Sequence, residues 1–234
     1  MTLRHVAVHL LETLEKLNPP RSPWLARQTA QAQSFWVDQT LLDEAPERLG
    51  SPTWLPFPSI LIETAQDDQL GPVLAFQDDT IGPGVVIWPV GWSRGAWVPS
   101  VVGAWVHDDK ATLIYLDERR QGGFENVEPA IWLVSYLTSL LQCRNVETAV
   151  QAAPAKLNAA RARRGKPPLP AYRKVVIHVR DRPAVAREVE SHASPRAHWR
   201  RGHFRQLPQG QTFVRACLVN PGGTPLTGGY EVRP

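Results

Sequence analysis

The sequence contains little cysteine, with Cys143 and Cys217 the two examples in 234 residues. They lie in dissimilar contexts and form no metal-type spacing, so the sequence predicts buried, reduced thiols, with a disulfide as the minor alternative. Long apolar runs and a signal-peptide layout at the N-terminus are also missing. We therefore expect no membrane span and a cytoplasmic location.

Motifs typical of common enzyme classes are missing as well. The sequence has no phosphate-binding loop of the Lys-Ser/Thr type, no dinucleotide fingerprint, no Gly-x-Ser-x-Gly and no His-Glu-x-x-His. This favours a binding protein over an enzyme, and we predict no cofactor and no metal. One catalytic alternative stays open: His198 and His203 could serve as acid and base in a metal-independent ribonuclease.

Charge is divided unevenly along the chain. Residues 1–150 carry 10 basic and 18 acidic residues, a net charge of −8, whereas residues 151–234 carry 16 basic and 4 acidic residues, a net charge of +12. The sequence thus predicts an acidic body over 1–150 and a basic C-terminal portion over 151–234, with one continuous domain as the alternative. Either the basic portion binds a polyanionic or acidic partner, or the two halves attract each other.

The apolar pattern predicts an α+β fold. It has N-terminal helices, an antiparallel β meander packed on a central apolar helix, and a basic C-terminal β portion. Acidic pairs such as Asp78-Asp79 and Asp108-Asp109 are interpreted as turn residues at strand ends, not as a metal cluster. The expected helices span residues 3–17, 23–42, 128–143 and 154–164, and the expected strands span 59–63, 73–76, 85–88, 96–98, 101–107, 112–116, 172–179, 194–207 and 213–219.

The stretch from Ser194 to Leu207 is the most informative one. It holds four arginines, two histidines, a tryptophan and a phenylalanine in fourteen positions. Guanidinium groups bind phosphate in two-pronged fashion, and neighbouring aromatic rings can stack on unpaired bases. A second basic cluster lies at 161–166. Together they give the predicted nucleic-acid-binding residues Arg161, Arg163, Arg164, Lys166, Trp199, Arg200, Arg201, His203, Phe204 and Arg205.

Several segments carry a resemblance to a known family. The segment Pro195-Arg196-Ala197-His198-Trp199-Arg200-Arg201-Gly202-His203-Phe204 looks like an Arg-Gly-His-aromatic motif, and Val214-Arg215 with Leu218-Val219-Asn220 looks like the strand after it. The apolar helix at 131–137 and the linker at 156–172 are similar in layout. Over roughly the last hundred residues, the chain resembles a phage-borne anti-CRISPR family directed at the type V-A effector nuclease, and its uncharacterised phage and plasmid relatives.

The resemblance implies a function and partners. That family acts on production of the effector nuclease, through its nascent chain and messenger RNA. We therefore expect an inhibitor from a mobile genetic element that lowers synthesis of a host defence protein in the bacterial cytoplasm. The implied partners are RNA or the ribosome and the nascent peptide of a defence protein such as the type V-A effector nuclease, without a membrane. The ribonuclease and an RNA-binding regulatory phage protein remain as alternatives.

Overall fold

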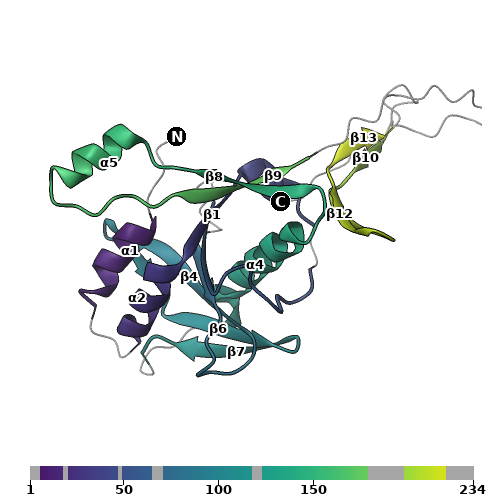
Figure 1. Ribbon diagram of the computed structural model, residues 1–234. Coiled ribbons are helices and arrows are strands. Elements are labelled where there is room, and N and C mark those ends of the chain that lie inside the picture. The colour runs from purple at the N-terminus through teal and green to yellow at the C-terminus, as the bar shows by residue number, and fades with distance from the viewer. Residues whose placement is uncertain are drawn as a thin grey trace, which may run out of the picture.

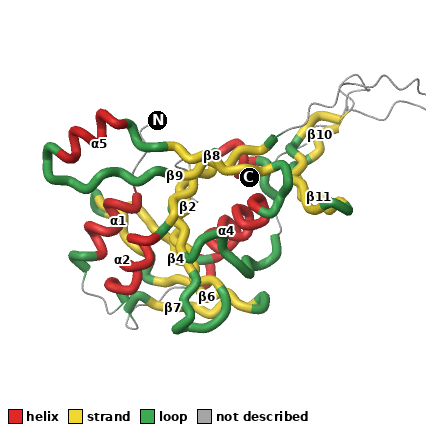
Figure 2. Tube along the Cα trace, viewed as in Figure 1, coloured by secondary structure: helices red, strands yellow, loops and turns green. Residues whose placement is uncertain are grey.

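The computed structural model describes residues 6–17, 21–46, 49–64, 71–117, 123–178 and 198–219. Figure 1 and Figure 2 show a mixed sheet with helices on both of its faces and a small β-structure at one end. No helix within the described ranges is long and apolar enough to cross a membrane. The elements are α1 (Val6–Leu14), α2 (Ser22–Gln31), β1 (Gln33–Val37), α3 (Gln39–Asp43), β2 (Ser59–Thr64), β3 (Val73–Phe76), β4 (Val85–Ser93), β5 (Ala96–Pro99), β6 (Val102–His107), β7 (Lys110–Tyr115), a 3-10 turn (Phe124–Asn126), α4 (Glu128–Leu141), β8 (Val146–Gln151), α5 (Ala155–Ala162), β9 (Tyr172–Ile177), β10 (His198–Arg200), β11 (His203–Leu207), β12 (Gly210–Val214) and β13 (Cys217–Val219).

The main sheet has nine strands in the order β7-β6-β4-β3-β2-β1-β9-β8, with β5 paired to β4. The predicted α+β class is confirmed, and the strands from β2 to β7 form the expected antiparallel meander. The sheet as a whole is mixed, however, because β1 runs parallel to both of its neighbours, β2 and β9. Strands β1 and β9, which are far apart in the sequence, therefore lie side by side within the sheet.

The prediction of one helix over 23–42 is wrong. Helix α2 ends at Gln31, and residues 33–37 form β1. Phe35 and Val37 are buried on the face of the sheet toward α4, and Ser34 and Trp36 alternate with them. Aromatic and β-branched side chains fit a pleated sheet better than a helix, and here the flanking strands decide the outcome.

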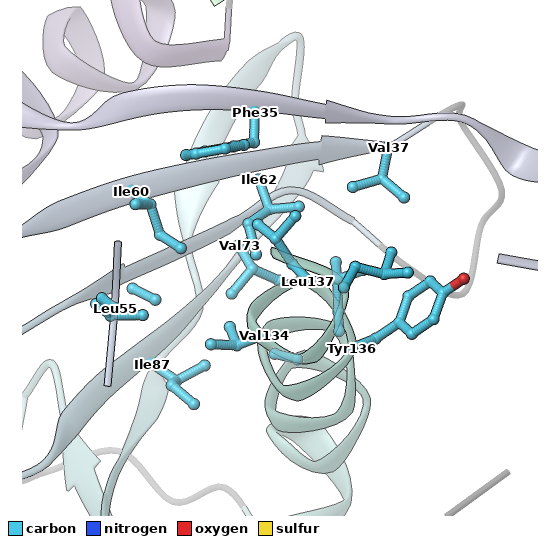
Figure 3. Packing of buried hydrophobic residues seen from close by; sticks show 14 of the residues in the cluster. Phe35, Val37, Leu55, Ile60, Ile62, Val73, Ile87, Val134, Tyr136 and Leu137 are labelled. Atoms are coloured by element: carbon cyan, nitrogen blue, oxygen red, sulfur yellow. The ribbon is translucent and has the colours of Figure 1, made fainter. Parts of the chain in front are cut away.

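The two faces of the sheet are covered by different helices. In β2, Ile60 and Ile62 point to the face toward α4, whereas Leu61 points to the face covered by α1 and α2. Figure 3 shows α4 residues such as Val134 and Leu137 facing the strand residues. Each fully buried aliphatic side chain contributes about 1.5–3 kcal/mol through removal from water. Helix α4 is thus the covered central helix that the sequence predicts.

The acidic pairs Asp78-Asp79 and Asp108-Asp109 lie in turns at strand ends, as predicted. Asp108 and Asp109 have φ angles of 48° and 58° and join β6 to β7, where His107 pairs with Lys110. Two successive positive φ angles are the mark of a two-residue hairpin turn of type I′. Asp78 accepts hydrogen bonds from the Thr80 backbone N–H at 2.9 Å and from the indole Nε1 of Trp24 at 2.5 Å.

Candidate nucleic-acid interface

Residues 198–219, called the basic arm here, form two small two-stranded sheets. Strand β11 pairs antiparallel with β12 across the turn at Pro208, and Phe204 lies opposite Phe213. Strand β10 pairs with β13. The prediction of one continuous strand over 194–207 is wrong, because β10 ends at Arg200 and β11 begins at His203; residues 194–197 lie outside the described residues.

Gly202 explains the break between β10 and β11. It is buried, and a Cβ atom added there would lie 2.3 Å from the carbonyl oxygen of Glu44 and 3.0 Å from Cζ of Phe213. Only a residue without a side chain allows such a close approach of two backbone segments. The arm therefore bends at Gly202, where it lies against the end of α3.

Asn145 fastens the arm to the main sheet. Its Nδ2 donates a hydrogen bond to the carbonyl of Phe213 at 2.9 Å, and its Oδ1 accepts one from the Phe213 N–H at 3.0 Å. The backbone N–H of Arg144 donates to the carbonyl of Gln211 at 2.9 Å. The polar groups of β12 thus find partners in the loop between α4 and β8, as buried backbone groups require.

Three aromatic rings fill the space beneath these hydrogen bonds. Phe204 and Phe213 lie with ring centroids 5.1 Å apart, and Tyr136 of α4 is 6.3 Å from Phe204 and 6.1 Å from Phe213. The Tyr136 hydroxyl donates to the carbonyl of Leu41 at 2.7 Å, and burial raises the pKa of that hydroxyl. Phe204, a predicted base-stacking residue, is half-buried with its ring in this cluster.

The outer side of the arm is positively charged. Arg200, Arg201 and Arg205 are exposed. Nη2 of Arg200 lies 2.9 Å from Nε2 of His203, and Nδ1 of His203 lies 3.2 Å from the Arg201 carbonyl. Because a guanidinium can only donate, Nε2 of His203 accepts and Nδ1 carries the proton. Both ring nitrogens are engaged, in contrast to the free acid or base of the ribonuclease alternative.

The structure does not describe every predicted site residue. The side chains of His198 and Trp199 lie outside its described part, although their backbones pair with Val219 and Leu218. Within the described ranges, no three His, Cys, Asp or Glu side chains come together as metal ligands.

One cysteine departs from its prediction. Cys143 is buried, and burial raises the pKa of its thiol to about 11, as expected for an inert thiol. Cys217 is exposed, so the prediction that it is buried is wrong. It lies on β13, in a two-stranded sheet outside both hydrophobic cores.

The second basic cluster lies apart from the arm. Arg163, Arg164 and Lys166 are exposed at the end of α5. Arg161 differs from them, because it is half-buried and its Nε donates to the carbonyl of Pro167 at 2.8 Å. The structure does not bring the two clusters together, since α5 and the strands β10 to β12 lie at opposite ends of the molecule (Figure 1).

An apolar groove beside β8 was not predicted. It has a volume of about 230 Å³. The guanidinium of Arg173 lies 5.0 Å from the ring centre of Phe57, and its Nη1 donates to Oγ1 of Thr148 at 3.3 Å. Nε of Arg173 is buried and has no hydrogen-bond acceptor among the described residues. One feature of the sequence could have indicated this groove, namely the loop Trp54-Leu55-Pro56-Phe57-Pro58, in which prolines separate two aromatic residues. The lining residues are Phe35, Trp54, Pro56, Phe57, Leu141, Val146, Glu147 and Thr148.

Comparison with known proteins gives one match. The model of the AcrVA2-like family, described as the anti-CRISPR type V subtype A2 family, matches residues 33–221. The match begins at β1 and includes the groove, α5 and the arm, so it extends well beyond the last hundred residues. No curated protein and no solved structure matches the chain.

Proposed function

The chain belongs to the AcrVA2-like family of type V subtype A2 anti-CRISPR proteins, and from this premise we propose that it lowers synthesis of a host defence protein by contacting that protein's nascent chain and its messenger RNA or ribosome. The observation that carries this proposal is the orientation of the basic arm. One side of the arm is fixed to the body through Gly202, Asn145 and Phe213, and the other side exposes arginines to solvent.

The RNA contact is assigned to Arg200, Arg201 and Arg205. No described carboxylate forms an ion pair with Arg200 or Arg205, whereas Arg215 of the same arm is paired with Glu44. An exposed guanidinium such as those of Arg200 and Arg205, which no described carboxylate neutralises, is suited to phosphate. Several such groups on one surface give an affinity that falls steeply with salt.

The nascent peptide is assigned to the groove beside β8. This strand is at the edge of the main sheet, so one row of its backbone N–H and C=O groups has no partner strand among the described residues. An extended peptide can add to such an edge while its side chains enter neighbouring pockets. The rings of Trp54 and Phe57, which line the groove, would receive apolar side chains of the peptide.

Translation of a type V-A effector nuclease in a bacterial extract tests the proposal. We expect added protein to lower both effector protein and effector messenger RNA, and to leave a transcript with a mutated start codon unaffected. Arg200→Ala/Arg205→Ala should weaken the effect by about tenfold, as expected for the loss of two phosphate contacts. The matched control is Lys16→Ala/Lys110→Ala, which removes two exposed cations of the body.

Two results would contradict the proposal. Equal loss of the start-codon mutant transcript would show that no nascent chain is needed. Cleavage of naked RNA by the pure protein in the presence of a chelator would instead support the ribonuclease that uses His198 and His203.

A further inference from the structure

The segment between β8 and β9, residues 152–171, forms a projecting structure called the α5 hairpin here. Helix α5 has eight residues, none of them buried. Isolated helices of this length are only marginally stable in water, so the hairpin depends on contacts between its own two sides. Asn158 accepts from the Leu169 N–H at 2.8 Å and donates to the Leu169 carbonyl at 3.3 Å, and the Leu169 side chain is buried.

The end of α5 is shaped by Gly165. Its φ angle is 64°, its N–H donates to the carbonyl of Ala162 at 3.0 Å, and the N–H of Lys166 donates to that of Arg161 at 3.0 Å. This pair of hydrogen bonds is a Schellman motif, in which a left-handed residue closes the helix. It turns the chain back so that Arg163, Arg164 and Lys166 all lie at the tip of the hairpin.

The hairpin has the composition of a phosphate-binding surface. No acidic residue occurs between Glu147 and Asp181, and no aromatic residue occurs from 152 to 171. The exposed cations are Lys156, Arg163, Arg164 and Lys166. Cations without neighbouring carboxylates attract a polyanion, and without aromatic rings there is no platform on which a base could stack.

The hairpin and the basic arm are attached to opposite ends of the β8–β9 ribbon. At one end, Asn145 donates to the carbonyls of His178 and Phe213, which is where the arm is fixed. At the other end, the Tyr172 hydroxyl donates to Oε1 of Gln151, just where the chain leaves for α5. Each strand has six residues, so the ribbon separates the two basic surfaces by roughly 20 Å. Figure 2 shows α5 and the strands β10 and β11 on opposite sides.

We infer that the α5 hairpin is a second, independent phosphate-binding surface, which binds the RNA backbone without reading bases. This inference rests on the proposed RNA contact of the arm. An RNA must bridge the β8–β9 ribbon to reach both surfaces, and each contact then raises the effective concentration of the other. The protein consequently favours long RNA over short fragments.

Fluorescence anisotropy with labelled RNA tests this inference on the full chain. The variant Arg163→Ala/Arg164→Ala/Lys166→Ala leaves Arg161 and Gly165, and with them the hairpin structure, in place. An RNA of about three nucleotides is too short to bridge the ribbon, even as an extended single strand whose phosphates lie further apart than the roughly 3.4 Å per strand of a duplex. We expect the triple variant to bind this RNA within about twofold of the wild type and an RNA of about 24 nucleotides at least tenfold more weakly, with a shallower salt dependence.

One control variant and three possible outcomes decide the test. Lys16→Ala/Arg27→Ala/Lys110→Ala, which removes three exposed cations of the body, should bind both RNAs like the wild type. If the triple hairpin variant binds the long RNA as the wild type does, or loses the same factor on both RNAs, the inference is overturned. If Arg200→Ala/Arg205→Ala alone weakens binding, the arm contact stands and the hairpin contact falls. Absence of RNA binding by the wild type would overturn both.

Discussion

Arg215 donates hydrogen bonds to the carboxylate of Glu44 across 171 positions of sequence, with Nε 3.0 Å from Oε2 and Nη2 2.5 Å from Oε1. This two-pronged pair joins the last strands of the basic arm to the end of α3. Hydrogen bonding to Glu44 raises the pKa of Arg215, so the guanidinium stays charged. Attraction between the acidic and basic parts of the chain thus occurs at this position, while Arg200 and Arg205 remain exposed.

Loss of the Glu44–Arg215 pair should loosen the arm more than the body. For Arg215→Ala we expect a cost of about 1 kcal/mol, since the arginine is partly exposed but the geometry is two-pronged. Arg215→Lys should restore only part of it, because an ammonium cannot match both carboxylate oxygens. Amide hydrogen exchange should accelerate in residues 203–214 and stay unchanged in β2 to β4; a uniform acceleration would contradict this prediction.

Gly202→Ala should displace the arm. The new Cβ would collide with the backbone carbonyl of Glu44, which cannot move without shifting α3, so we expect a loss of about 1–3 kcal/mol. Thermal unfolding measures the loss. Gly91→Ala is the matched control, because no atom lies within 4 Å of the added Cβ there. Equal melting temperatures for both variants would show that the contact with Glu44 is not close.

Removal of the Asn145 side chain should also release β12. In Asn145→Ala the N–H and carbonyl of Phe213 both lose their partners, and an unsatisfied buried polar group costs about 1–3 kcal/mol. We expect limited proteolysis to cut within residues 203–214 at least tenfold faster. Asn126→Ala, which removes hydrogen bonds to the nearby Gly123 and Glu125, provides the control and should leave the rate unchanged.

A buried acid should make stability fall as pH rises. Burial raises the pKa of Glu63 from 4.5 to about 8, with partial compensation by a hydrogen bond from the backbone of Val6. Between these values the folded protein keeps the proton and the unfolded chain releases it, so the free energy of unfolding decreases from pH 4.5 to pH 8 and then levels off, by roughly 3–5 kcal/mol in all. Urea denaturation at pH 5 and pH 9 measures this decrease.

The matched variants for this test are Glu63→Gln and Glu147→Gln. The first should remove most of the decrease, because its amide does not titrate and can still accept from Val6. The second alters an exposed acid and should keep the decrease. A Glu63→Gln protein whose stability changes with pH as the wild type does would contradict the assignment.

Local patterns were sufficient for much of the fold. The strands from Ser59 to Tyr115 show short β-branched runs between turn residues, and the structure has them at nearly the predicted positions. Helix α4 follows from the spacing of its apolar residues. The closing of α5, whose last helical residue is Ala162, follows from the glycine at position 165. These features depend on neighbours in the sequence, so the sequence shows them directly.

Features set by distant contacts were missed. The segment at 33–37 becomes a strand because β2 and β9 flank it, and no local pattern indicates either neighbour. Strand β8 went unpredicted because it is a mostly exposed edge strand with weak alternation. The break at Gly202 depends on the carbonyl of Glu44, and the groove depends on the loop at 54–57 meeting β8. The separation of the two basic clusters follows from the β8–β9 ribbon, and composition alone cannot show it.

The parallel pairing of β1 has a consequence for the protein's own synthesis. Its partner β9 ends at Ile177, so one edge of β1 stays open until three quarters of the chain have left the ribosome. A product that stops before Tyr172 lacks β9 and all of the strands after it, and leaves that edge ready to join another chain. Premature termination should therefore yield insoluble fragments, and the finished sheet can assemble only late in translation.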